Sequence, residues 1–259
     1  MVEAHQPDRR KVMRGGLAVA AALAVPVGGR AVAAVDRSGR SEPKTFHLHH
    51  DFNTLEGLGI YRWDNGTTQG PRHKSNVYLV DKGDGDHFVR VRTRYSRERE
   101  RWESGGFKVL NSQHRYGRIR CRIRISASNR TRGAGLLWPQ DGCWPVYGEL
   151  DFYEFGEDSP DRTVGHITNH FGDRCGQNEQ EGPVPIHGDF TKWHTVEVLW
   201  RPGRWRVFID GTQVWTTTRN VPSWPMWLGF QTALATAGPR PRTPTYLDID
   251  WVDIVGGPA

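Results

Sequence analysis

The chain has 259 residues, of which 25% are charged and 11% aromatic, and its formal net charge is +6 at pH 7. This length allows one large all-β domain or two smaller ones, with enough apolar material for a core. Its three cysteines are too few for a disulfide framework and lack the spacing of metal ligands, which excludes a small disulfide-stapled scaffold.

The first residues contain the three parts of an export signal. A twin arginine, Arg9-Arg10, precedes an apolar run from Leu17 to Val27 that is too short to span a bilayer, and a small-residue cleavage pattern ends at Ala33. We therefore predict a twin-arginine signal peptide over residues 1–33, a polar linker over 34–44 and a secreted domain over 45–257. A disordered basic tail is the alternative interpretation of the first segment.

Removal of the signal peptide weakens the case for a nucleic-acid ligand. Residues 1–33 contain five basic and two acidic side chains, a net charge of +3, so the mature chain keeps +3 of the formal +6. Arginines still gather at 90–101 and 115–124, but the whole is only mildly basic. We expect a monomer that binds neither nucleic acid nor a membrane.

Short apolar segments separated by Gly, Pro, Asn and Asp fill the remainder of the chain, without a long amphipathic helix or a repeat. This pattern predicts an all-β fold, a jelly-roll β-sandwich of two antiparallel sheets. The predicted strands are 76–80, 88–93, 117–125, 133–138, 149–154, 164–171, 193–200, 205–209, 227–232 and 247–255.

The clearest alternation lies at 118–125, where arginines occupy every second position between apolar residues. The apolar set is expected to face the core and the arginines to face outward. These arginines could form a basic face for an anionic polymer, or they could be the solvated outer surface of a sheet. We favour the second interpretation.

The stretch 149–154 places three carboxylates in an otherwise apolar strand. Side chains alternate along a strand, so Glu149 and Asp151 share one face, and Glu154 joins them only if a β-bulge at Phe152-Tyr153 adds one residue. Like charges this close raise at least one pKa, which provides an acid and a base in one site. The expected gap of about 5 to 6 Å between the outer carboxyl groups is typical of a retaining glycosidase.

Eleven tryptophans are many for this length. Aromatic faces stack on the apolar faces of sugar rings, so we predict that Trp102, Trp138 and Trp144 contribute to a substrate groove. Trp144 lies in the turn before the acidic strand and is the best candidate. Core packing is the alternative for each, and it is the interpretation that we favour for the three later tryptophans Trp200, Trp205 and Trp215.

Two of the cysteines, Cys143 and Cys175, lie in predicted loops that flank the acidic strand. One bridge between them is conceivable outside the cell, but the sequence does not give their Cα separation, so paired and free states both stay open. Cys121 lies among alternating isoleucines and is expected to be a small core residue.

The run 144–154, WPVYGELDFYE, resembles the signature of glycoside hydrolase family 16, the laminarinase and lichenase group, in its bulged form. Segments 102–107, 116–118 and 135–138 resemble the strands that precede the family's active site, and 193–200, 207–211 and 247–253 resemble its later strands. The resemblance covers residues 45–257. It implies a concanavalin A-like jelly roll with a cleft on the concave sheet.

This resemblance also implies a role for each carboxylate. Glu149 matches the nucleophile, Glu154 the general acid/base and Asp151 the auxiliary carboxylate between them, which is also placed to hydrogen-bond Glu149. The implied activity is double-displacement hydrolysis of internal bonds in a polysaccharide, with β-1,3- or mixed-linked β-glucan as the first candidate. No cofactor is required.

Three further residues match positions of the family. His170 resembles a histidine near the acid/base, with a histidine satisfied in its own loop as the alternative. Gln231 falls where the family often has a polar cleft residue. Asp250 matches a position that helps to hold a structural calcium ion in many members, although one carboxylate cannot establish a site for an ion with six to eight oxygen ligands.

Two segments depart from the better-known glucanases, 173–182 and 235–238. Loops of this kind shape the sugar subsites, so a transglycosylase or a galactan hydrolase of the same family stays open as an alternative. A lectin-like module on the same sandwich is the alternative from another class, because a fold does not dictate activity.

Overall fold

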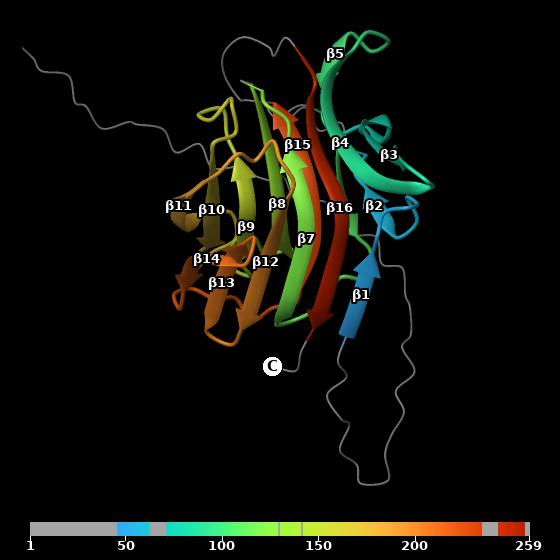
Figure 1. The fold of residues 1–259 in the computed structure, drawn as a ribbon. Coiled ribbons are helices and arrows are strands. Elements are labelled where there is room, and N and C mark those ends of the chain that lie inside the picture. Colours follow the sequence, from blue (N-terminus) through green and yellow to red (C-terminus); the bar gives the residue numbers. More distant parts are fainter. Residues whose placement is uncertain (1–45, 63–70, 129, 141, 235–242, 257–259) are drawn as a thin grey trace, which may run out of the picture.

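The computed structural model describes residues 46–62, 71–128, 130–140, 142–234 and 243–256. These residues form two antiparallel sheets packed face to face, with one short 3-10 helix, η1 (Lys74–Asn76) (Figure 1). The predicted jelly-roll β-sandwich is confirmed. No helix of the described residues is long and apolar enough to cross a membrane.

One sheet has nine strands and the other seven. In the nine-stranded sheet the order is β14 (Thr212–Thr217), β13 (Arg204–Ile209), β12 (His194–Arg201), β7 (Gly117–Ile125), β16 (Thr245–Gly256), β4 (Asp86–Ser96) and β3 (Val77–Gly83), with β1 (Phe46–His50) on β16 and β5 (Arg101–Glu103) on β4. In the seven-stranded sheet it is β11 (Glu179–His187), β10 (Val164–Phe171), β9 (Glu149–Phe155), β8 (Thr131–Pro139), β15 (Met226–Leu234), β6 (Gly106–Val109) and β2 (Leu58–Ile60).

The core lies between the inner faces of the two sheets. Strand β7 contributes the apolar half of its alternation, and β9 contributes Leu150, Phe152, Tyr153 and Phe155, all buried. Tryptophans Trp200 and Trp205 stack at 4.9 Å between ring centroids, and neither they nor Trp215 is more than 8% exposed. The core assignments of these three tryptophans and of Cys121 are therefore confirmed.

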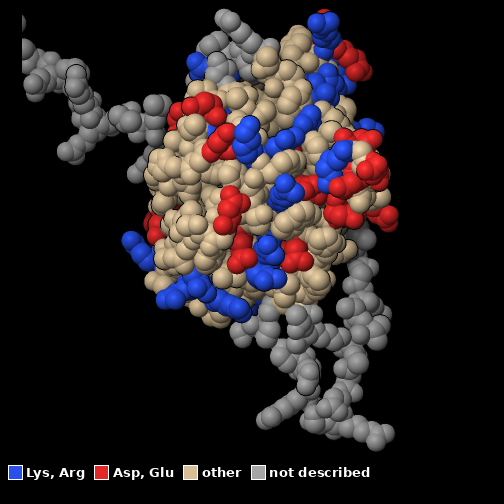
Figure 2. Space-filling view, in the orientation of Figure 1, with Lys and Arg blue, Asp and Glu red and all other residues tan. Residues whose placement is uncertain are grey.

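The outer face of the nine-stranded sheet carries alternating acidic and basic side chains, which Figure 2 shows as interleaved red and blue. Three aspartates of β16 each lie within 4.0 Å of basic groups from neighbouring strands. We call this set the ion-pair ladder: Asp248 with Arg90 and Arg124, Asp250 with Arg122 and Lys82, and Asp253 with Arg118 and His47. Most arginines predicted to face outward are thus neutralised, which favours a solvated sheet surface over a polymer-binding one.

The ladder also corrects the expectation of a calcium site at Asp250. One oxygen of this carboxylate accepts a hydrogen bond from Lys82, and the other accepts one from Arg122 at 3.2 Å. Two cations at one carboxylate occupy the space and supply the charge that an ion would otherwise bring, so these residues do not fit calcium.

Several edge strands are not predicted by the sequence pattern, most clearly β11, whose sequence holds two prolines and two glutamates before its single buried residue. Edge strands lack a second neighbour and are exposed on more than one side, so they need no apolar alternation. The predicted signal peptide (1–33) and linker (34–44) lie outside the described residues.

Candidate active site

A β-bulge in β9 brings three carboxylates to one face of the seven-stranded sheet. Gly135 of β8 pairs with Tyr153, but the next residue, Leu136, pairs with Asp151, so β9 has one residue more than its partner. The pairing with β10 shifts at the same place, between Glu154 and Asp151. Phe152 and Tyr153 both face the core, and Glu154 returns to the side of Glu149 and Asp151. The predicted bulge is confirmed.

Neighbouring strands add their outward side chains to this face, which we call the acidic face. In register, Glu149 lies opposite His170, Asp151 opposite Thr168 and Glu154 opposite His166 on β10. On the other side, Ala134, Leu136 and Trp138 of β8 form a small apolar cluster separate from the main core. The three carboxylates therefore lie between an apolar strand and a strand of hydrogen-bonding groups.

Glu149 is fully buried and has one hydrogen bond from the described residues. The indole Nε1–H of Trp144 donates to its Oε2 at 2.6 Å, while Oε1 has no protein partner among these residues. Burial raises the pKa of Glu149 well above its usual range, and the charges of Asp151 and Glu154 add to this effect, while the indole N–H opposes it.

Asp151 is held by a chain of hydrogen bonds that runs outward through β10. Its Oδ2 lies 3.1 Å from Nε2 of His170, whose Nδ1 lies 3.1 Å from Oδ1 of Asn178. Both ring nitrogens thus face oxygen atoms, an environment that favours the imidazolium. Burial alone would lower the pKa of His170, but the hydrogen bond and charge of Asp151 outweigh it and raise that pKa.

This arrangement corrects the expected partner of Asp151. A hydrogen bond to Glu149 was predicted from their spacing, but the described residues show Asp151 bonded to His170 and its Oδ1 without a protein partner. Two carboxylates on one strand point the same way and approach each other, yet only a protonated one can donate. The imidazole offers a better donor.

Glu154 is less buried than Glu149, and its Oε2 accepts a hydrogen bond from the hydroxyl of Thr168 at 2.9 Å. Burial, followed by the charge of Asp151, raises the pKa of Glu154 to about 7. A carboxyl group with this pKa is about half protonated at pH 7, and the protonated form can release its proton to a leaving group.

An aromatic row crosses the acidic face from β10 to β15. The ring centroid of Trp144 lies 6.0 Å from that of His170 and 5.9 Å from that of Trp138, with the two indoles nearly parallel at 7°. Trp138 lies 6.4 Å from Trp227, and Trp227 lies 6.3 Å from Tyr61. Such flat, partly polar surfaces bind sugar rings, and two of the three predicted tryptophans belong to the row.

Glycines make room for the far end of this row. A Cβ at Gly106 would lie 2.6 Å from the Tyr61 ring, and one at Gly229 would lie 2.5 Å from Trp227. Gln231, two residues after Gly229 on the same face, accepts a hydrogen bond from Arg72 Nη2 at 3.1 Å. The structure thus places Gln231 on the acidic face as a side chain already fixed by a buried arginine.

Trp102 is not brought together with these residues. It lies on β5, which pairs with β4 of the nine-stranded sheet, and its ring packs edge-on against Tyr95 at 6.1 Å between centroids. A short strand of this kind gives no sign in the sequence of the sheet to which it will attach.

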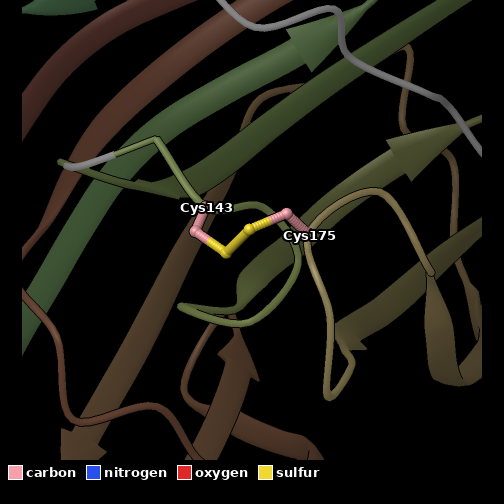
Figure 3. The surroundings of a disulfide bond; sticks show 2 residues. All are labelled: Cys143 and Cys175. Carbon is pink, nitrogen blue, oxygen red and sulfur yellow. A yellow bond between two sulfur atoms is a disulfide. The ribbon is translucent and has the colours of Figure 1, made fainter.

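A disulfide ties the two loops that flank the acidic strand. Cys143 and Cys175 are bonded, with Cα atoms 5.0 Å apart, and the bond joins the β8–β9 connection to the β10–β11 connection (Figure 3). Beside it, Gly176 N donates to the carbonyl oxygen of Trp144 at 2.7 Å. The bridge therefore holds the segment that carries Trp144 against the segment that carries Asn178.

Three residues of the acidic face are not predicted from the sequence: Tyr61, Trp227 and Asn178. Trp227 had a signal, because it alternates with the buried Met226 and Leu228 and must therefore face outward. Tyr61 and Asn178 lie outside regular alternation, and only the register of β6 and β10 with their neighbours brings them to the face.

One donor set on the acidic face has the composition of a cation site. Glu149, Asp151 and His170 each offer one ligand atom, and these atoms lie within 4.8 Å of one another. His170, however, is engaged on both nitrogens with Asp151 and Asn178, so it is held as a hydrogen-bond donor. The set suits proton chemistry better than metal ligation.

Comparisons with known proteins identify the family and the fold of this chain. The model of glycosyl hydrolases family 16 matches residues 71–253. Among solved structures, a family 16 endo-glucanase from Bacteroides ovatus superposes with a TM-score of 0.69 at 17% identity, covering 80% of this chain and 99% of that one. No curated protein sequence gave a significant match.

Two other solved structures show the same fold. A catalytic LamA structure from Zobellia galactanivorans gives a TM-score of 0.63 at 19% identity over 80% of this chain and 96% of that one. The β-glucanase of Bacillus licheniformis gives 0.64 at 17% identity over 80% and 97%. At identities this low, the superpositions show a shared fold and nothing further.

Proposed function

Because the chain belongs to glycosyl hydrolase family 16 and is a glycoside hydrolase, we propose that it cleaves internal β-glycosidic bonds of a β-1,3- or mixed-linked β-glucan with retention of configuration. The observation that carries this proposal is the bulge in β9. It aligns Glu149 and Glu154 on one face, and burial raises the pKa of both.

The two glutamates divide the work of a double displacement. Once a substrate displaces water, Glu149 attacks the anomeric carbon in its ionised form, while Glu154 donates its proton to the leaving oxygen. Glu154 then takes a proton from water, which hydrolyses the glycosyl ester on Glu149. Its pKa of about 7 suits both directions of proton transfer near neutral pH.

Asp151 and His170 regulate the charge around this pair. The charge of Asp151 raises the pKa of both glutamates, and the charge of His170 lowers the pKa of Glu154. Trp144 stabilises the ionised form of Glu149 through its N–H donor. Of these groups, Trp144 acts on Glu149 alone, and it favours the ionised nucleophile that the first step needs.

The substrate assignment rests on the aromatic row and on the neighbours. LamA from Z. galactanivorans has been solved with laminaritriose and laminaritetraose, and the B. licheniformis protein is a β-glucanase. A row of indoles along the sheet fits a polysaccharide chain laid across several strands. Secretion of residues 45–257 after cleavage of the 1–33 signal peptide and a monomeric state are parts of the same proposal.

The test is reducing-sugar release from laminarin, lichenan, agarose and carrageenan by wild type and by Glu149→Gln. We expect cleavage of one or both glucans by wild type, β-anomeric products in the first minutes by NMR, and loss of about 10⁴-fold in the variant. A 2-fluoro oligoglucoside should add its mass to the peptide that contains Glu149. Cleavage of agarose or carrageenan alone would indicate a galactan hydrolase.

No hydrolysis of any polymer, together with retained binding, would indicate a lectin-like module and would overturn the proposal. Longer oligosaccharides appearing in place of reducing ends would indicate a transglycosylase.

A further inference from the structure

A basic hollow lies on the outer face of the nine-stranded sheet, at its β13–β14 edge. Its volume is about 300 Å³, and it is lined by Arg204, Arg206, Gln213, Thr216, Thr217 and Thr218. Figure 2 shows basic side chains gathered along the lower left of the molecule, the region where Figure 1 places β13 and β14. The acidic face belongs to the other sheet, so this hollow is separate from the site described above.

The arginines of the hollow differ from two outward-facing arginines of β7, Arg118 and Arg120. Arg204 and Arg206 have no carboxylate within 4.0 Å among the described residues, whereas Arg118 and Arg120, two strands away, pair with Asp253 and Glu197. The Nε of Arg206 is buried without a hydrogen-bond partner among the described residues; the Nε of Arg120 shares this feature but has the Glu197 carboxylate 3.4 Å away. The positive charge of the hollow is therefore not neutralised.

Strand register makes this concentration of charge costly. Arg201 lies directly opposite Arg204 across the β12–β13 hairpin, and like charges in that position destabilise a sheet. The nearest carboxylate in contact with the lining is Glu181 of β11, whose Oε2 accepts a hydrogen bond from Thr217 at 2.9 Å. One acidic group at the margin does not balance three arginines.

The lining groups match a charged sugar. Guanidinium groups bind carboxylate and sulfate oxygens through paired N–H donors. Thr216 already donates its hydroxyl to the carbonyl of Trp205, which leaves its oxygen as an acceptor, and Gln213 is exposed and offers both a donor and an acceptor. The hollow thus offers N–H donors for an anionic group and, beside them, donors and acceptors for hydroxyl groups. This combination fits a saccharide that carries a negative charge.

We propose that this hollow binds an anionic residue of a polysaccharide, through Arg204 and Arg206, at a site separate from the acidic face. The charged group is a carboxylate or a sulfate ester. Because the hollow and the acidic face lie on opposite sheets, the protein can hold an acidic polymer with one and a neutral glucan with the other.

Affinity electrophoresis of the full chain in gels containing polygalacturonate, dextran sulfate or neutral dextran tests this proposal. We expect one or both acidic polymers to retard wild type, with retardation falling as salt is added, and dextran to have no effect. Retardation by polygalacturonate identifies a carboxylate ligand, and retardation by dextran sulfate alone identifies a sulfate ligand.

The matched variants remove the same charge from the same sheet face. Arg204→Gln with Arg206→Gln should weaken binding of the acidic polymer at least tenfold. Arg118→Gln with Arg120→Gln, which takes two arginines from ion pairs instead, should weaken it less than twofold. Far-UV circular dichroism confirms that both double variants fold.

Equal losses in the two double variants, or no retardation of wild type by either acidic polymer, would overturn the proposal. Repeating the measurement with Glu149→Gln separates it from hydrolysis, because binding at the hollow does not depend on that residue. An inactive wild type that binds acidic polymers would refute the proposed glucanase activity and leave the hollow established.

Discussion

The two outer faces of the sandwich carry carboxylates that are buried to a similar degree and have opposite neighbours. On the seven-stranded sheet, Glu149 and Asp151 are at most 1% exposed, and the basic side chain hydrogen-bonded to this pair is His170. On the nine-stranded sheet, Asp248 and Asp250 are 3% and 6% exposed, and each lies against two basic side chains. Burial alone therefore does not make a carboxylate reactive.

The charges of the neighbouring side chains decide how burial affects a carboxylate. Where carboxylates face one another, burial and mutual repulsion raise the pKa, and the protein gains a proton donor at neutral pH at a cost in stability. Where they face guanidinium groups, the charge of each is satisfied by the other; the hydrogen bond and charge of Asp248 raise the pKa of Arg90. The face of the seven-stranded sheet is suited to proton transfer, and the face of the nine-stranded sheet is stabilised by ion pairs.

The largest expected effect that tests this comparison is on catalysis. Glu154→Gln should lower kcat for a glucan with a poor leaving group by about 10²- to 10⁴-fold, because the amide cannot donate the proton. Wild-type activity should fall as the pH rises through about 7, where Glu154 ionises, and the variant should lose this limb. Steady-state kinetics between pH 4 and 9 measure both. If the variant keeps the fall in activity at high pH, Glu154 is not the group that donates the proton.

Asp248→Asn should have the next largest effect, and on stability alone. It leaves Arg90 and Arg124 without their shared carboxylate, and breaking a largely buried pair of this kind costs about 3 kcal/mol. Chemical denaturation at pH 7 measures the change, with kcat at a temperature well below unfolding as the control. Loss of activity in a fully folded variant would show that the two faces are coupled.

Glu154→Gln should act on stability in the opposite direction. A folded pKa of about 7, raised from 4.5, means that the folded state holds this proton more tightly than the unfolded state does. Its contribution to stability is full below the unfolded pKa and is lost as the pH rises through about 7. The free energy of unfolding of the variant should therefore exceed that of wild type above pH 7 by about 3 kcal/mol, and the two values should converge near pH 4. Urea titrations at the two pH values decide this.

Trp144→Phe should have the smallest effect of the four. The substitution keeps an aromatic ring in the row but removes the N–H donor to Glu149. Because this hydrogen bond lowers the pKa of Glu149, its loss should raise that pKa. We expect kcat to fall about tenfold and the acidic limb of the pH profile to move to higher pH. A change confined to KM would mean that Trp144 serves sugar stacking only.

Much of this comparison could be read from the sequence, because alternation along a strand reports which side chains share a face. The bulge at Phe152-Tyr153 and the core position of Cys121 follow from local patterns of residue type, whereas the sequence leaves Cys143 and Cys175 open between bonded and free. The sequence also predicted part of the aromatic row, namely Trp138 and Trp144.

What the sequence did not reveal depends on which strands become neighbours. His170 reaches Asp151 because β10 pairs with β9 in one register, and Trp102 misses the row because β5 joins β4. Asp250 resembles a calcium ligand until β3 and β7 bring Lys82 and Arg122 to it. Long-range register is set by the whole core, so no short motif reports it.

The Cys143–Cys175 bridge has a practical consequence for how this enzyme is prepared. It joins the segment that orients Trp144 to the segment that orients Asn178, so the supports of Glu149 and His170 share one covalent link. Cytosolic expression in a reducing host would leave both thiols free and the two loops untied. Protein made in an oxidising compartment, or reoxidised after purification, is therefore the material in which the activity of the site is to be judged.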